Sequence, residues 1–290
     1  MSDNDAKLSD WLKSGLQYLL PQHAISRLIY RIARIQTPAV KNSLIRGFIR
    51  RFGVDMNEAA TTDYHHYPCF NAFFTRALHP DARPLTTDAR GIACPVDGCI
   101  SQIGVIDRDN ILQAKGRTYS VVELLAGDAA LAGNFIDGVF ATLYLSPRDY
   151  HRIHMPLAGG LRNMLYVPGR LFSVNPPTTR VVPRLFARNE RVAAVFDTDA
   201  GCMAVVLVGA LNVGSIETVW AGEITPSRVT ALRNCEYQRG AVDLKKGAEL
   251  GRFNMGSTVI LLFEPHRIRW QSRLAAGMHV RMGESMGTML

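Results

Sequence analysis

The sequence predicts an α+β fold, in which N-terminal amphipathic helices precede a mainly antiparallel β core. Two observations lead to this class. Residues 1–60 repeat apolar side chains at helical spacing, whereas the chain beyond Gly91 consists of short apolar or β-branched runs separated by Gly, Pro, Asn and Asp. Strands that follow helices, rather than alternate with them, are typical of α+β proteins. We therefore expect a helical segment at residues 1–60 and a β-rich domain at residues 61–290.

The N-terminal segment is predicted to contain two well-delimited helices. Apolar residues from Ile25 to Ile35 follow helical spacing, and arginines fall on another face of the same helix. Thr37 and Pro38 are a good N-cap and first-turn pair for the second helix, which Gly53 is placed to end.

The β-rich part is predicted from its short apolar runs. The clearest candidates are residues 103–106, 139–145, 192–196, 203–208, 213–219 and 259–263. One helix, around Val121 to Leu131, is expected to interrupt the strands.

Positive charge is concentrated near the N-terminus. Between Trp11 and Val54 the chain has eight basic residues and no Asp or Glu, and this local charge equals the net charge of +8 of the whole chain. The eight are Lys13, Arg27, Arg31, Arg34, Lys41, Arg46, Arg50 and Arg51. Such an asymmetry indicates an anionic partner surface, either a membrane or a nucleic acid.

An anionic membrane surface is the partner that the pattern favours. The helices combine an apolar face with a basic face, as interfacial membrane helices do. Few aromatic residues are interleaved with the basic ones and no nucleic-acid-binding motif is present, so no nucleic acid is predicted as a partner. The alternative is that the apolar faces pack on the β domain and the arginines are simply solvated.

The sequence predicts no transmembrane helix and no secretory signal. No run of about 18 apolar residues occurs, and no basic region precedes an apolar core at the N-terminus. The five cysteines are scattered without a C-x-x-C pair, which favours reduced thiols over a zinc site. We expect a peripheral protein on the cytoplasmic side of the cell membrane.

Four polar residues are candidates for chemistry. Asp97 lies in a predicted turn, His151 and His154 lie three positions apart, and Ser257 opens the apolar run at 258–263. Asp, His and Ser can form a proton relay in any chain order, because only their geometry matters. The alternatives are that Asp97 is only a turn residue and that the two histidines are metal ligands. No third ligand is evident nearby, so no metal is predicted.

Six short motifs occur in a fixed order along the chain. They are YPCFNAFFTR at 67–76, PVDG at 95–98, YHRIHMP at 150–156, FSVN at 172–175, GSIE at 214–217 and GST at 256–258. Together they resemble the pyruvoyl-dependent, prokaryotic-type phosphatidylserine decarboxylase family over nearly the whole chain. The family usually has Leu-Gly-Ser-Thr at its processing site, and here Met255 replaces the Leu, which is a volume-conserving change.

The resemblance implies that the chain cuts itself between Gly256 and Ser257. The products would be a large chain of residues 1–256 and a small chain of residues 257–290, held together as a heterodimer whose further oligomerisation is left open. The Ser257 hydroxyl would attack the Gly256 carbonyl, with His154 as its base and Asp97 orienting that base. The small chain would then begin with a pyruvoyl group made from Ser257, and this group is the implied cofactor.

The resemblance also implies a reaction. The pyruvoyl ketone would form a Schiff base with phosphatidylserine and accept the electrons left by departing carbon dioxide, which gives phosphatidylethanolamine. His151 is the candidate acid for returning a proton, because histidine is easily tuned to act near neutral pH. The roles of His151 and His154 could be exchanged.

Substrate contacts are a further expectation. Phe172, Ser173 and Asn175 are candidates for binding the lipid phosphate or the processing site, and ordinary turn hydrogen bonding is the alternative.

Three other functions compete with this interpretation. One is a serine hydrolase that uses an Asp97/His154/Ser257 triad, although GST is not a Gly-x-Ser-x-Gly elbow. Another is a membrane-binding module in which Ser257 is structural. The last is a pyruvoyl decarboxylase for a soluble amino acid, which would not need the basic helices.

Overall fold

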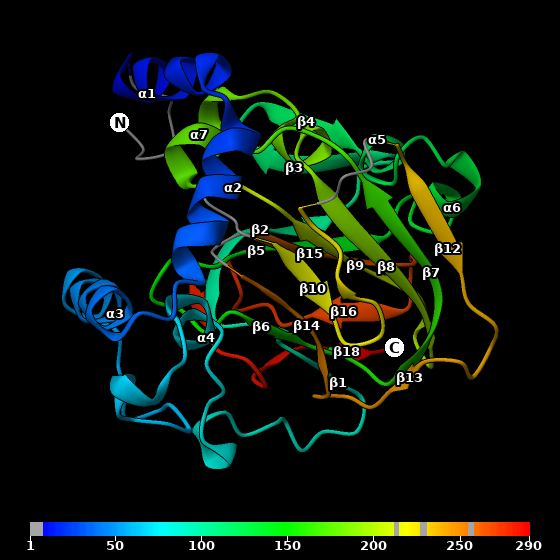
Figure 1. Cartoon of the computed structure of the whole chain (residues 1–290). Coiled ribbons are helices and arrows are strands. Elements are labelled where there is room, and N and C mark those ends of the chain that lie inside the picture. The colour runs from blue at the N-terminus through cyan, green and yellow to red at the C-terminus, as the bar shows by residue number, and fades with distance from the viewer. Residues whose placement is uncertain (1–7, 212–214, 227–230, 255–257) are drawn as a thin grey trace.

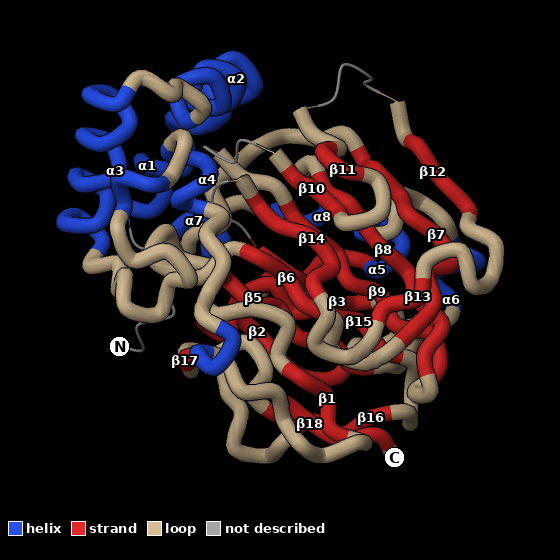
Figure 2. Tube along the Cα trace, turned by 60° about the horizontal axis from the view of Figure 1, so that its bottom comes forward, coloured by secondary structure: helices blue, strands red, loops and turns tan. Residues whose placement is uncertain are grey.

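The computed structural model describes residues 8–211, 215–226, 231–254 and 258–290 (Figure 1). The N-terminal helices lie together on one side of the molecule, and the β-sheets make up the rest (Figure 2). They are α1 (Leu8–Leu19), α2 (Gln22–Ala33) and α3 (Pro38–Phe52). The predicted α+β class is therefore confirmed as a mixture of N-terminal helices and antiparallel sheets. Among the described residues no helix is both long and apolar enough to cross a bilayer.

The boundaries of α3 are those predicted from the sequence. Pro38 occupies its first turn, and Gly53 ends it in the left-handed conformation (φ 64°), with its N–H bonded to the carbonyl of Ile49. Thr37 is at the N-cap position, but its side chain makes no capping hydrogen bond.

Helices α1 and α2 turn small and polar side chains toward the rest of the protein. Ser14 and Gln17 of α1 are buried, as are Gln22 and Ser26 of α2. Buried amide oxygens explain this orientation, because Gln17 accepts a hydrogen bond from the N–H of Ser173 (2.8 Å) and Gln22 from that of Leu171 (2.9 Å). The apolar faces of both helices are consequently left on the outside.

Helix α3 packs on the short helix α4 (Phe70–Phe74) through aromatic side chains. The ring of Phe48 lies 5.2–6.0 Å from the rings of Phe70, Phe73 and Phe74. Buried Ile45 belongs to the same cluster. The helical segment is thus joined to the residues that lead into the β domain.

One large sheet forms the centre of the β domain. Its strand order is β12-β7-β8-β9-β15-β5-β2-β17, with β13 also paired to β7. Every pair of strands among the described residues is antiparallel, as predicted. The strands of this sheet are β2 (Gly98–Val105), β5 (Val139–Tyr144), β7 (Gly159–Val167), β8 (Arg191–Thr198), β9 (Gly201–Val208), β12 (Arg233–Glu236), β13 (Asp243–Leu244), β15 (Thr258–Phe263) and β17 (His279–Val280).

Smaller sheets surround the large one. A four-stranded sheet has the order β11-β10-β14-β6, a three-stranded sheet has the order β1-β18-β16, and β3 pairs with β4. These strands are β1 (Gly91–Ala93), β3 (Asn110–Ala114), β4 (Arg117–Ser120), β6 (Arg152–His154), β10 (Ile216–Thr218), β11 (Gly222–Glu223), β14 (Glu249–Phe253), β16 (Ile268–Trp270) and β18 (Ser285–Met289). The strand expected at 213–219 is β10, and part of the expected range lies outside the described residues.

Strand β15 lies between β9 and β5 near the middle of the large sheet. Thr258 faces Val208 on one side and Tyr144 on the other, and all six residues of the strand are buried. Val259 contributes to the core on one face and Ile260 to the core on the opposite face, as the two-residue period of a strand requires. The predicted buried strand is confirmed.

The prediction of a single helix around Val121 to Leu131 is wrong. The structure has two short helices there, α5 (Val121–Leu124) and α6 (Ala129–Gly133). A capping box at Ser120 begins α5, and Ala126 (φ 64°) and Gly127 (φ 88°) adopt the left-handed conformation that interrupts a helix. The remaining short helices are α7 (Pro176–Val181) and α8 (Leu185–Arg188), with 3₁₀ turns at Tyr64–His66 and Pro80–Ala82.

Candidate active site

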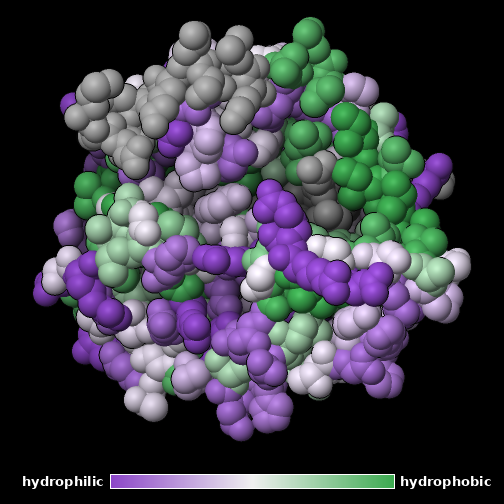
Figure 3. All heavy atoms as spheres, turned by 90° about the vertical axis from the view of Figure 1, so that its left-hand side faces the viewer, coloured by the Kyte–Doolittle hydropathy of each residue, from purple (hydrophilic) through white to green (hydrophobic). Residues whose placement is uncertain are grey.

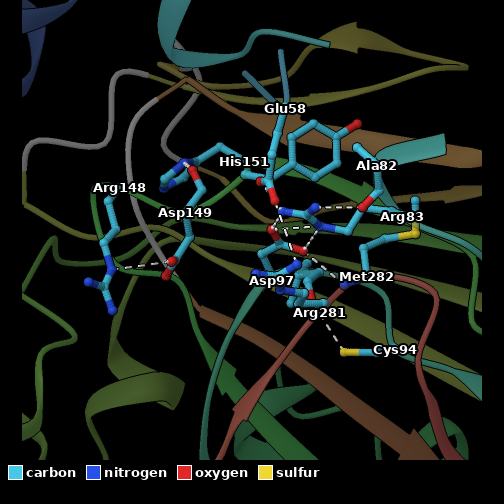
Figure 4. Close-up of polar contacts among 12 residues, drawn as sticks. Glu58, Ala82, Arg83, Cys94, Asp97, Arg148, Asp149, His151, Arg281 and Met282 are labelled. Carbon is cyan, nitrogen blue, oxygen red and sulfur yellow. Dashed lines mark hydrogen bonds and ion pairs between the residues drawn. The ribbon is translucent and has the colours of Figure 1, made fainter. Parts of the chain in front are cut away.

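Asp97 lies just before β2, and a buried arginine holds its carboxylate. The Nε of Arg83 donates to both oxygens of Asp97, at 2.9 and 3.0 Å, and the backbone N–H of Met282 donates to Oδ1 at 2.9 Å. Arg83 also donates to Glu58 at 2.7 Å, so one guanidinium bridges two carboxylates (Figure 4). The hydrogen bond from Arg83 lowers the pKa of Glu58, although burial opposes the shift. Sequence reasoning missed Arg83, because nothing in its neighbourhood links it to Asp97.

His151 is fully buried and holds a neutral imidazole. Its Nδ1 lies 2.7 Å from the carbonyl oxygen of Asp149, which can only accept, so Nδ1 carries the proton. The ring packs on Phe74 at a centroid distance of 4.1 Å. Burial lowers the pKa of His151 to about 3. Its Nε2 is buried and has no hydrogen-bond partner among the described residues, so its lone pair is available to accept a proton.

His154 belongs to β6, and both of its ring nitrogens are hydrogen-bonded. Nδ1 donates to the carbonyl of Gly247 (2.8 Å), and Nε2 accepts from the hydroxyl of Tyr150 (3.0 Å). Burial lowers the pKa of His154 and raises that of Tyr150 to about 12, so the phenol stays protonated as a donor.

The structure brings Asp97 and His154 into neighbouring segments without a direct hydrogen bond between their side chains. The backbone N–H of His154 donates to the carbonyl of Pro95 (2.9 Å), which places β6 beside the turn that carries Asp97. The described side-chain partners differ, because Asp97 pairs with Arg83 and His154 with Tyr150.

Gly256 and Ser257 lie outside the described residues, as does Met255. The described residues just before them are held by hydrogen bonds. The N–H of Phe253 donates to the carbonyl of His151 (3.0 Å), and the N–H of Asn254 donates to that of Ser215 (2.8 Å). The side-chain amide of Asn254 also donates to the Ser215 hydroxyl. His151 is therefore bonded to the strand that leads toward the predicted processing site.

A cavity of about 340 Å³ adjoins this region. Asp97, Asp149 and Tyr150 line it, and so do four arginines, namely Arg76, Arg83, Arg148 and Arg281. No group of three or more His, Cys, Asp or Glu side chains that could hold a metal ion occurs in the described part of the chain.

The chain matches the model of a known family over most of its length. A family model described as phosphatidylserine decarboxylase matches residues 70–288, and a second model, described as PSD, matches residues 12–53. The chain belongs to the phosphatidylserine decarboxylase family.

Similar proteins from several bacteria bear the same name. A "Phosphatidylserine decarboxylase proenzyme" of Alkalilimnicola ehrlichii is 61% identical over 87% of this chain and 88% of its own length. Proteins with this name from Bordetella pertussis and Nitrosococcus oceani are both 56% identical, over 96% and 98% of this chain and 94% and 93% of their own lengths. Nothing in the matches supports the serine hydrolase alternative.

The three residues predicted to bind substrate have structural contacts in this family member. Phe172 is buried, and its N–H donates to the Asn189 side chain (3.1 Å). The N–H of Ser173 binds Gln17 of α1, and the side chain of Asn175 caps α7 by accepting from the N–H of Thr178 (3.0 Å). Their role in substrate binding remains a prediction.

Proposed function

We propose that this chain is a self-processing phosphatidylserine decarboxylase that converts phosphatidylserine to phosphatidylethanolamine. Membership of the family and the proenzyme names of its relatives support the reaction. The observation that carries the proposal is the neutral, buried imidazole of His151, whose Nε2 is free of described partners and whose backbone is bonded to Phe253. Such a nitrogen can take up a proton from a reacting group beside it, and the lowered pKa makes the imidazole return that proton readily.

The proposed cofactor is a pyruvoyl group formed from Ser257 after cleavage at the Gly256–Ser257 bond. The flanking residues fit such a group, because Thr258 begins the central strand and its buried hydroxyl has no described partner. The ketone of the group would supply the electron sink for decarboxylation. We assign Asp97 and His154 to the cleavage step, and His151 to taking up and returning a proton during turnover.

The neutral state of His151 fixes the order of these proton transfers. Because Nδ1 already donates to the carbonyl of Asp149, Nε2 has to accept a proton before it can act as an acid. The buried Tyr150 hydroxyl donates a hydrogen bond to Nε2 of His154. This hydroxyl therefore has to move away or relay a proton when His154 acts as a base.

Cleavage would divide the chain without separating its parts. The small chain, 257–290, would contain β15, and its pairing with both β9 and β5 would keep it bound to the large chain, 1–256. We retain a membrane-association segment at 1–60 and a catalytic domain at 61–290 as functional units, although the aromatic cluster of α3 and α4 joins them physically.

The outward apolar faces of α1 and α2 support peripheral attachment to the cytoplasmic side of the cell membrane. More than half of the exposed large hydrophobic side chains among the described residues lie in α1–α3 or the short turns between them. Leu19 is 83% exposed, Leu16 65% and Leu28 59%. The side of the molecule that bears the helices shows apolar surface beside strongly hydrophilic surface (Figure 3). Exposed apolar side chains beside basic ones support the proposal that these helices attach to a lipid surface.

Basic residues add an electrostatic contribution, which is smaller than the sequence suggests. Arg27, Arg31, Arg46, Arg50 and Arg51 are exposed. Arg34 instead pairs with Glu223 at 2.5 Å, and Lys41 is buried and donates to the carbonyl of His65. Each remaining exposed cation adds about 1 kcal/mol of attraction to an anionic leaflet.

A groove between α2 and α3 fits the apolar part of a lipid. It has a volume of about 440 Å³ and is lined by apolar side chains, among them Ile29, Ile32, Leu44 and Phe52, with Arg51 also in its lining. A lipid surface is thus the proposed partner, and the proposed arrangement keeps the acyl chains near α2 and α3.

The intact mass of the purified protein, with and without a carbonyl reagent, tests the proposed processing. We expect two fragments, the smaller of which begins at position 257 and gains the mass of the reagent. Carbon dioxide release from phosphatidylserine vesicles tests the reaction. An active protein that consists of one uncut chain would refute the self-processing mechanism.

A further inference from the structure

Arg76 is a buried arginine that lacks a counter-ion in the described part of the chain. It lies directly after α4 and Thr75, and only 5% of its surface is exposed. Among the described residues its Nε has no hydrogen-bond partner, and its Nη2 makes one long contact of 3.4 Å to the carbonyl of Arg148. The guanidinium carbon also lies 5.4 Å from the ring centre of Phe73. Burying a guanidinium that has no carboxylate partner and only these weak contacts is unfavourable, so this position is costly for the fold.

The carboxylates around Arg76 are bonded to other groups. Asp97 and Glu58 are both held by Arg83, and Arg281 lies 3.6 Å from Glu58. Asp149 accepts a hydrogen bond from the backbone N–H of Ser146 at 2.7 Å. No ion pair of Arg76 with a carboxylate occurs among the described residues, so its charge is available to a ligand.

Arg76 also lies close to the proposed catalytic histidine. It lines the cavity of about 340 Å³ that Asp97, Asp149 and Tyr150 share. Phe74, two residues earlier, packs on the ring of His151 at 4.1 Å. After burial, the charge of Arg76 contributes to the lowered pKa of His151. An anion bound at Arg76 would therefore belong to the molecule whose proton His151 moves.

We infer that Arg76 is the counter-ion of the phosphodiester of the substrate and thereby selects phospholipids over free amino acids. The inference rests on the proposed function and adds a residue that recognises the substrate. A guanidinium presents paired donors that match phosphate oxygens.

Phosphatidylserine offers a second anion, its carboxylate, but this group suits Arg76 less well. The carboxylate loses its charge as it becomes carbon dioxide. A buried cation beside it would stabilise the ground state more than the transition state and would slow the reaction. The phosphodiester keeps its charge throughout, so pairing it with Arg76 binds both states equally.

A comparison of two buried arginines separates a binding role from a structural one. Arg191 is 2% exposed, and its guanidinium donates to the backbone carbonyls of four residues, Glu123, Leu124, Ala187 and Asn189. Arg191→Met should lower the urea midpoint of unfolding. Arg76→Met keeps the apolar stem and removes an unpaired charge, so its midpoint should be unchanged or higher.

Binding is measured by titration calorimetry with two probes that each carry one of the anions. Glycerophosphoethanolamine has the phosphodiester without a carboxylate, and O-methylserine has the carboxylate without a phosphate. Both are titrated into the Ser257→Ala chain, which cannot form the ketone, so the result does not depend on processing. We expect Arg76→Met to weaken the binding of glycerophosphoethanolamine roughly 10- to 100-fold, because a charge-assisted hydrogen-bonded pair is lost. The affinity for O-methylserine should be unchanged.

Turnover provides the second measurement. With a short-chain phosphatidylserine, Arg76→Met should raise KM by a similar factor with little change in kcat, and Arg76→Lys should restore part of the loss. If Arg76→Met instead weakens the binding of O-methylserine, then Arg76 binds the carboxylate and the inference is overturned. The inference would also be overturned if the variant bound both probes equally weakly or bound both as well as the parent chain does. The same holds if the parent chain did not bind glycerophosphoethanolamine. Normal probe binding in a protein without decarboxylase activity would refute only the proposed function.

Discussion

The carboxylate of Asp97 accepts a hydrogen bond from the backbone N–H of Met282, 2.9 Å away and 185 residues later in the chain. Next to Met282, the guanidinium of Arg281 lies 3.6 Å from Glu58. Two neighbouring residues of the proposed small chain therefore contact carboxylates of the proposed large chain. Arg83 binds both of these carboxylates, so it is the centre of a contact between the two products of cleavage.

Arg83→Met should destabilise the protein by about 3–5 kcal/mol, because it leaves Asp97 buried without its cation. The measurement is urea unfolding in the Ser257→Ala background, where the chain stays whole. Arg83→Lys keeps the charge but loses the two-pronged donor geometry, so it should recover part of the loss. A loss below about 1 kcal/mol, typical of an exposed ion pair, would contradict a structural role for this buried network.

The two histidines should separate cleavage from turnover. Ser257→Ala and His154→Ala should remain uncut, because each loses a group assigned to the attack on Gly256. His151→Ala should be cut but should turn over at least roughly 100-fold more slowly, the usual contribution of a general acid or base. Intact mass reports the cut and carbon dioxide release reports the turnover. An uncut His151→Ala together with a cut His154→Ala would reverse the two assignments.

The sequence predicts those parts of this protein that local patterns determine. Pro38 and Gly53 set the two ends of α3 because each acts on the backbone within one turn. The apolar run from Thr258 to Phe263 can bury all of its side chains only inside a sheet. The prediction of one helix around Val121 to Leu131 was wrong because Ala126 adopts a left-handed conformation, which an alanine in the sequence does not indicate.

Local sequence patterns do not predict contacts between residues that are far apart in the chain. Helical periodicity shows that α1 and α2 have an apolar face but not which way it points. Their orientation depends on hydrogen bonds that the side-chain oxygens of Gln17 and Gln22 accept from backbone N–H groups about 150 positions away. In the same way, Asp97 and His151 were predicted as candidates by their motifs, whereas the bond of Arg83 to Asp97 and the free charge of Arg76 have no sequence signal.

Stability should depend on pH through His151. Its pKa is about 3 in the folded protein and close to 6.5 in the unfolded chain, so below pH 6.5 the unfolded chain binds a proton that the folded protein does not. The free energy of unfolding should therefore fall as the pH drops from 6.5 toward 3, by up to about 1.4 kcal/mol per pH unit from this group.

His151→Gln isolates this contribution from that of other groups. His154 also has a lowered pKa and acts in the same direction, so the parent protein will lose stability through both histidines. The variant should show a smaller slope of unfolding free energy against pH between 6.5 and 4, measured by urea unfolding. Identical slopes for the parent and the variant would mean that His151 is accessible to protons in the folded protein.

The outward face of α1 and α2 should drive membrane binding through Leu19 and Leu28. Leu19→Gln and Leu28→Gln should each weaken partition to phosphatidylserine-containing vesicles roughly 10-fold or more, since burying a leucine side chain contributes about 1.5–3 kcal/mol. Neither should lower the unfolding free energy, because both side chains are mostly exposed in the folded protein. Val105→Gln is the matched control, because Val105 is 72% exposed but belongs to β2 and not to these helices. Vesicle sedimentation at low and high salt then separates the apolar contribution from that of the arginines, since only the latter is screened. Equal losses from all three variants would show that general surface hydrophobicity, and not this helical face, attaches the protein to lipid.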